Sequence, residues 1–155
     1  MQYRHKKQFG QHFLRDESAL EAIVQALKAY WPSGPVWEIG PGQGVLTRKL
    51  LQHTAWELYL TEIDRDLQAW LRQNISLPQE RWLDGDFLRV PKPVEGCMAL
   101  TGNFPYQIST EILFRLLDEY PKIPVMVGMF QREVAQRVAA KEGSKTYGVT
   151  SILLQ

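Results

Sequence analysis

The sequence contains few of the residues that build disulfides or metal sites. Its 155 residues include one cysteine, Cys97, and three histidines, His5, His12 and His53, which stand far apart. A single cysteine cannot form an internal disulfide, and isolated histidines provide no zinc-like cluster, so we expect no bound metal. The absence of a disulfide framework favours a reducing, cytoplasmic setting.

Long apolar runs are also missing. No stretch approaches the roughly 18 apolar residues that a membrane-spanning helix needs, and charges stand where a signal peptide would have its apolar region. We therefore expect neither secretion nor a membrane segment. Since 45% of the residues are apolar and no repeat or linker is visible, residues 1–155 are expected to form one domain and to act as a monomer.

A large excess of one charge is absent as well, because 18 Lys and Arg face 17 Asp and Glu, which gives a net charge of +1. The charge is nevertheless segregated. Segment 1–15 has no acid and carries four basic residues, Arg4, Lys6, Lys7 and Arg15, which leaves −3 for the rest of the chain. This segment is either a solvated tail or an arm that contacts phosphate. Phe9, Phe13 and Leu14 favour packing of residues 9–14 on the domain.

Apolar periodicity predicts helices that alternate with strands. A first helix should begin after an N-cap at Asp16 and end before Pro32. Strands are expected at 36–39, 57–62, 81–84, 97–101, 124–130 and 149–154, and further helices from 45, at 67–71, at 112–117 and at 134–138. Such alternation indicates a mostly parallel α/β sheet, which binds ligands at the carboxyl ends of its strands.

The end of the first predicted strand carries a glycine-rich turn, Gly40-Pro41-Gly42-Gln43-Gly44. Its spacing is G-x-G-x-G, and a nicotinamide-type G-x-G-x-x-G would need glycine where Val45 stands, which disfavours an NAD enzyme. No Gly-Lys-Ser/Thr follows, so a phosphate loop of the Walker type is also excluded. Taken alone, the turn favours a tight strand-to-helix connection that binds nothing.

Carboxylates follow at the next two strand ends. Glu62 lies 22 positions after Gly40, near the spacing at which an acidic residue binds a ribose; the alternative is a surface ion pair with Arg65. Asp86 and Phe87 offer an acceptor for an adenine amino group beside an aromatic ring, or else a turn-capping Asp. Together these ends predict an adenosine site without a diphosphate cradle, for which S-adenosylmethionine is a fitting ligand.

The fourth strand end reads Asn103-Phe104-Pro105-Tyr106. Pro105 fixes its own backbone and extends Phe104, so that nearby carbonyls point in set directions. Asn103 adds an amide oxygen and Tyr106 a ring for stacking. These groups suit an exocyclic amine of adenine or cytosine, although a proline turn capped by Asn is the structural alternative.

In this order the motifs resemble KsgA/RsmA-type ribosomal RNA adenine dimethyltransferases. The matching strings are Phe9-Gly10-Gln11-His12-Phe13-Leu14, Glu38-Ile39-Gly40-Pro41-Gly42-Gln43-Gly44, Glu62-Ile63-Asp64, Gly85-Asp86, Asn103-Phe104-Pro105-Tyr106 and Gln131-Arg132-Glu133-Val134. The resemblance implies a Rossmann-like class I methyltransferase fold. Many members of the family have Asn in place of His12 and Leu in place of Phe104.

The resemblance also implies the site residues. The S-adenosylmethionine pocket would be lined by His12, Leu14, Gly40, Gly42, Glu62, Asp86, Phe87 and Asn103. Methyl transfer to N6 of two adjacent adenosines near the 3′ end of small-subunit rRNA would use Asn103, Pro105 and Tyr106. Contacts with rRNA are expected from Arg4, Lys6, Lys7, Lys141 and Lys145, of which the last two fit an ordinary solvated loop equally well.

Two other functions stay open at this point. One is an Erm-like methyltransferase of large-subunit rRNA, and the other is a non-catalytic RNA-binding assembly factor. Family members continue with a further strand and a helical domain, so we expect the chain to end inside the sixth strand, with residues 149–155 lacking their usual neighbour.

Overall fold

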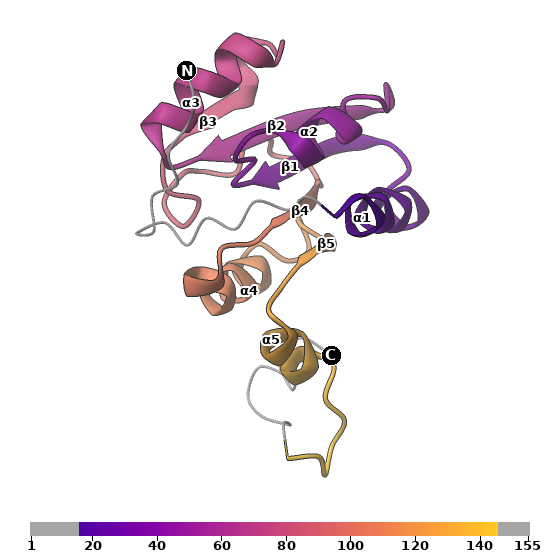
Figure 1. The fold of residues 1–155 in the computed structure, drawn as a ribbon. Helices are drawn as coiled ribbons and strands as arrows, with labels where there is room; N and C mark the ends of the chain where they lie inside the picture. The colour runs from indigo at the N-terminus through magenta and orange to yellow at the C-terminus, as the bar shows by residue number, and fades with distance from the viewer. Residues whose placement is uncertain (1–15, 146–155) are drawn as a thin grey trace.

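The computed structural model describes residues 16–145, which form a parallel sheet with helices on both faces (Figure 1). The strands are β1 (Gly34–Ile39), β2 (Trp56–Glu62), β3 (Trp82–Asp84), β4 (Ala99–Asn103) and β5 (Val125–Met129). The helices are α1 (Glu17–Tyr30), α2 (Val45–Leu50), α3 (Arg65–Asn74), α4 (Ser109–Asp118) and α5 (Arg132–Val138), with short 3-10 turns at Gln79–Arg81 and Tyr106–Ile108. The predicted α/β alternation is confirmed, while segments 1–15 and 149–154 lie outside the described residues.

The strand order, β3-β2-β1-β4-β5, fixes where a ligand can bind. From β1 the chain first builds outward through β2 and β3, and it then returns to the other side of β1 for β4 and β5. The connections that follow β1 and β4 therefore leave for opposite faces of the sheet, where α2 and α4 pack. The point between these two strands, where the order reverses, is the usual ligand crevice of an open parallel sheet.

Side chains of β1 alternate between two apolar clusters. Val36 faces the cluster formed with α1 and α2, whereas Trp37 and Ile39 face the cluster formed with α4. All three side chains are buried. Burial on both faces is expected for a central parallel strand, and it explains why β1 reads as an apolar run with one exception, Glu38.

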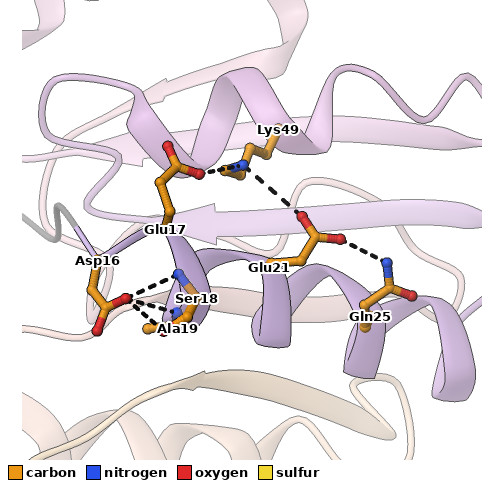
Figure 2. A network of polar contacts seen from close by, with 7 residues as sticks. All are labelled: Asp16, Glu17, Ser18, Ala19, Glu21, Gln25 and Lys49. Atoms are coloured by element: carbon orange, nitrogen blue, oxygen red, sulfur yellow. Dashed lines mark hydrogen bonds and ion pairs between the residues drawn. The ribbon is translucent and has the colours of Figure 1, made fainter.

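The start of α1 is fixed by the predicted cap. Asp16 Oδ1 accepts from the backbone N–H groups of Ser18 at 2.9 Å and Ala19 at 3.3 Å (Figure 2). Figure 2 also shows Lys49 of α2 paired with Glu17 of α1 at 2.7 Å. Exposed pairs of this kind add little stability, so the buried face of α1, which carries Leu20, holds it against the sheet.

Strand β4 was expected at 97–101, but in the structure it begins at Ala99 and ends at Asn103. Glycine and asparagine have low strand propensity, so the sequence pattern places Gly102 in a turn. In the structure Gly102 pairs with Ile39 on β1 and with Gly128 on β5. A Cβ at Gly102 would lie 2.6 Å from the Ile39 carbonyl oxygen, so glycine permits this close approach of the strands.

A buried carboxyl interrupts the first apolar cluster. Glu38 is 1% exposed, and its Oε2 atom has no hydrogen-bond partner among the described residues. Two buried hydroxyls, Thr47 Oγ1 and Thr101 Oγ1, likewise lack partners, and Thr101 is the β4 residue paired with Glu38. The pKa of Glu38 is raised to about 8, mainly by burial and in part by the nearby charge of Glu62, while Thr47 opposes the rise.

Stability should consequently fall as the pH rises. Between the ordinary glutamate pKa of 4.5 and about 8, folded Glu38 keeps a proton that the unfolded chain has released. This difference removes up to about 1.4 kcal/mol of unfolding free energy per pH unit in that window. Glu38→Gln should flatten the slope in urea titrations at pH 5, 6, 7 and 8. An unchanged slope would contradict a protonated Glu38 in the folded chain.

Candidate functional site

A single pocket opens at the carboxyl ends of the strands and brings together the groups that the motifs carry. Gly40 and Gly42 follow β1, Glu62 ends β2, Asp86 follows β3 and Asn103 ends β4, and all five line this pocket. Pro105 and Tyr106 line it too. Tertiary structure therefore places together seven of the residues that the sequence selects for cofactor binding and catalysis.

The glycine loop crosses the pocket with its backbone in the left-handed region. Gly40 and Gly44 have φ values of 62° and 70°, which side chains adopt at a cost. A Cβ on Gly44 would lie 2.5 Å from the Ile75 side chain, whereas one on Gly40 would meet nothing within 4 Å. Gly44 thus serves packing, and Gly40 leaves backbone open to a ligand.

Glu62 ties this loop to the second strand. Its side chain is buried; Oε2 accepts from Gly42 N–H at 3.2 Å, and Oε1 accepts from Ile63 at 2.9 Å and Asp64 at 3.0 Å. These backbone groups, rather than Arg65, are its partners. Burial raises the pKa of Glu62, while the three N–H donors lower it.

The bonding pattern limits what Glu62 can still accept. A carboxylate offers about four lone-pair positions, two on each oxygen. Oε1 uses both of its positions, and Oε2 uses one. One acceptor position on Oε2 therefore stays available to a ligand hydroxyl, fewer than the two that a ribose diol would fill.

Asp86 and Phe87 point to different sides of their turn. Asp86 lines the pocket, and its Oδ1 accepts from Leu88 N–H at 3.0 Å, so it also caps the turn. Phe87 is buried against Trp37, with ring centroids 4.9 Å apart, and is absent from the described pocket lining. The Phe87 ring therefore belongs to the core behind the turn, and contact of Phe87 with a cofactor stays a prediction.

The fourth strand end forms one wall of the pocket. Asn103 ends β4, and the Tyr106 ring is 38% exposed at the start of a 3-10 turn. The Pro105 carbonyl accepts from Ile108 N–H at 3.2 Å and from the Ser109 hydroxyl at 3.1 Å. The same hydroxyl lies 3.4 Å from the Tyr106 carbonyl. Because a hydroxyl donates one proton, Ser109 can bond only one carbonyl fully at a time.

The buried Phe104 ring packs in the core next to this wall. Its ring is 1% exposed and lies 4.7 Å from the Phe130 ring. A Cβ on Gly128 would collide with the Phe104 ring and would lie 2.5 Å from the Gly102 carbonyl oxygen. The larger side chain at position 104 therefore fits because β5 has glycine beneath it.

The charge of the lining has one sign. Glu38, Glu62 and Asp86 line the pocket, and none of its described lining residues is Lys, Arg or His. Glu38 keeps its proton in the folded chain, and Asp86 lies 3.6 Å from Arg89, which is outside the lining. Glu62 and Asp86 still give the lining an acidic character, which favours a positively charged ligand over a phosphate-rich one. This disfavours an NAD or nucleoside triphosphate site by a route independent of the glycine spacing.

Some predicted residues lie elsewhere. His12, Leu14, Arg4, Lys6 and Lys7 fall outside the described residues. Lys141 and Lys145 are exposed in the segment after α5 and do not line the pocket.

The sequence analysis gives no role to several residues of the lining, among them Glu38 and Ile63. Glu38 could have been noticed as the one charge in the buried run of β1, and Ile63, 45% exposed, as the apolar neighbour of Glu62. Within residues 16–145 no group of three His, Cys, Asp or Glu could hold a metal ion, and no helix is long and apolar enough to cross a membrane.

Two solved structures share the fold of this chain. A dimethyladenosine transferase from Plasmodium falciparum superposes with a TM-score of 0.76 at 28% identity, over 92% of this chain and 51% of that one. The 23S rRNA methyltransferase ErmE superposes with a TM-score of 0.67 at 31% identity, over 81% of this chain and 50% of that one.

Curated relatives extend the likeness in sequence. The ribosomal RNA small subunit methyltransferase A of Cytophaga hutchinsonii is 45% identical over 97% of this chain, and that of Porphyromonas gingivalis is 45% identical over all of it. The chain spans 59% and 61% of the lengths of these two proteins. A family model described as "Ribosomal RNA adenine dimethylase" matches residues 2–155, and the chain belongs to this family.

Proposed function

We propose that this chain carries the methyl-transfer site of an rRNA adenine dimethyltransferase. It would transfer methyl groups from S-adenosylmethionine to N6 of two adjacent adenosines near the 3′ end of small-subunit rRNA. The observation that carries this proposal is the convergence of Gly40, Glu62, Asp86 and Asn103 on one pocket. Membership of the family supports it, and the single free cysteine, Cys97, suits a cytoplasmic protein.

The hydrogen-bond acceptors that line the pocket fit S-adenosylmethionine, whose sulfonium supplies an activated methyl group when bound. Asp86 offers an acceptor to the adenine amino group, and Glu62 offers its remaining position to the ribose. Glu38 adds a buried, protonated carboxyl whose Oε2 has no described partner, in a lining that has no described Lys, Arg or His. A ligand with a net positive charge matches that balance. His12 and Leu14 are proposed to complete the pocket.

The chain's part in the reaction is to position a target base. The N6 lone pair of adenine is delocalised into the ring, so acceptors for its hydrogens favour a nucleophilic, pyramidal nitrogen. Asn103 and the Pro105 carbonyl would supply these acceptors, and the exposed Tyr106 ring would stack on a base taken out of its helix. Most of the rate gain would then come from orientation.

Ser109 sets a condition on this mechanism. In the structure both acceptor positions of the Pro105 carbonyl are occupied, one of them by the Ser109 hydroxyl. Rotation of that hydroxyl toward the Tyr106 carbonyl, 3.4 Å away, would release one position for the amine of the base. The buried Ser109 would thus exchange partners when the target adenosine enters.

RNA contacts are proposed for the basic residues at the two ends of the chain, Arg4, Lys6, Lys7, Lys141 and Lys145. Such residues bind phosphate without reading sequence, so the target would be chosen by ribosomal shape. The likeness to ErmE makes large-subunit rRNA the rival target. Primer extension on rRNA from a deletion strain separates the two, because dimethyladenosine stops the polymerase at its position. Loss of the stop from small-subunit rRNA supports the proposal.

Glu62→Ala should weaken S-adenosylmethionine binding by about 1.5–3 kcal/mol, the range for a hydrogen bond to a charged group. Isothermal titration calorimetry measures the change. Glu57→Ala is the matched control, because Glu57 lies on the same strand with an exposed side chain that pairs only loosely with Arg81. Equal affinities of the Glu62→Ala and Glu57→Ala variants would remove Glu62 from the binding site.

Asn103→Ala should leave S-adenosylmethionine affinity nearly unchanged and slow methyl transfer about 100-fold or more, in line with the loss of one preorganised hydrogen bond to a reacting group. Transfer of a labelled methyl group to immature small subunits reports the rate. The control is Gln107→Ala, which removes an exposed amide from the next turn. A fully active Asn103→Ala variant would refute the acceptor role.

A further inference from the structure

Arg115 lies on α4, on the face of the sheet opposite to α1, and its charge is largely buried. Its side chain is 13% exposed, and burial lowers its pKa, against the attraction of Glu119 and Asp86. Taking a guanidinium out of water is unfavourable unless its contacts compensate. The contacts that Arg115 makes therefore indicate what it is for.

Two of those contacts fall on the turn that follows β3, at Phe87 and Val90. The guanidinium carbon lies 4.4 Å from the Phe87 ring centroid and 5.1 Å from that of Trp37. Nη2 donates to the Val90 carbonyl at 2.6 Å. Glu119, the residue that follows α4, pairs with Arg115 at 3.7 Å. Arg115 thus contacts the turn at two points, the Phe87 ring and the Val90 carbonyl.

The turn that Arg115 contacts, Gly85–Val90, contains Asp86, which lines the pocket. Gly85 N–H donates to the Glu62 carbonyl at 2.9 Å, and the Asp86 carbonyl accepts from Val90 N–H at 2.9 Å. Phe87 and Val90 lie on the Arg115 side, while Asp86 faces the pocket. A shift of the Phe87 ring would be transmitted directly to its chain neighbour Asp86.

We propose that Arg115 is a positioning residue for adenine recognition, which holds the Gly85–Val90 turn from behind so that Asp86 faces the 6-amino group of the cofactor. This inference rests on the proposed function. Arg115 touches no ligand itself. Its role requires a planar guanidinium, because a lysine cannot both stack on Phe87 and donate in a fixed direction to the Val90 carbonyl.

The test compares two ligands that differ only at the atom that Asp86 would recognise. S-adenosylhomocysteine has a 6-amino group, whereas S-inosylhomocysteine has a 6-oxo group and shares the ribose and amino-acid parts. Wild-type chain should bind the amino ligand more tightly, and Asp86→Ala should abolish the preference. The preference is measured as the dissociation constant of S-inosylhomocysteine divided by that of S-adenosylhomocysteine. Arg115→Lys and Arg115→Met should each reduce this ratio about tenfold.

Arg81→Met is the matched control, since Arg81 also lies over an aromatic ring, Tyr59 at 5.8 Å, and near a carboxylate, Glu57. It should leave the ratio unchanged. General destabilisation would weaken both ligands equally, so an unaltered ratio in Arg115→Lys would overturn the inference while the proposed function stands. Arg115→Lys should also add nothing in the Asp86→Ala background, and a further fall there would contradict action through Asp86.

Failure of the proposed function has a different signature. If wild-type chain binds neither ligand, the cofactor assignment is wrong, and the inference falls with it. If wild-type chain binds both ligands equally, Asp86 does not read the 6-amino group, which overturns the role given to Arg115 while leaving methyl-donor binding intact.

Discussion

The carboxylate of Glu62 accepts hydrogen bonds from three backbone N–H groups, and the shape of the pocket depends on these bonds. Gly42 belongs to the loop after β1, while Ile63 and Asp64 lead from β2 into α3. One buried side chain therefore fixes two neighbouring strand ends relative to each other. Charge-assisted bonds of this kind are stronger than neutral ones, and the ligand-binding surface is built around them.

Electrostatics follow from the same arrangement. Glu38 and Glu62 are both buried near the pocket floor, and the charge of Glu62 adds to the burial that raises the pKa of Glu38. Keeping Glu38 protonated relieves the repulsion between them. The Oε2 atom of this protonated carboxyl has no described partner, which represents stability given up at a functional position. A ligand group that forms a hydrogen bond with it would recover part of that stability.

Support for the pocket comes from the far face of the sheet. Arg115 of α4 packs against Phe87 behind Asp86, and Gly128 of β5 makes room for Phe104 behind Asn103. The residues that face the ligand are thus held by neighbours that point into the core. Side chains in a close-packed interior cannot shift independently, so the rear contacts restrict where the front groups lie.

Much of this protein could be predicted from its sequence, because local patterns encode local structure. Apolar spacing located α1 and the central strands, and Asp16 marked the first helix cap as observed. Gly40, Glu62, Asp86 and Asn103 were selected because each follows or ends a predicted strand, and parallel strands end at one edge of a sheet. Strand β4 was misplaced by two residues, since Gly102 has poor strand propensity and pairs only where two backbones approach closely.

Only the tertiary structure decided which of these groups keep open hydrogen-bond acceptor positions and which are held in place by core side chains packed behind them. Sequence placed Phe87 beside a ligand, but packing against Trp37 and Arg115 turns its ring into the core. The sequence assigned Glu62 to a ribose, but three backbone N–H donors already fill most acceptor positions of its carboxylate. Residue order thus determined the elements and the chemistry at their ends, whereas burial, hydrogen-bond partners and pKa depend on distant segments that meet only in the folded chain.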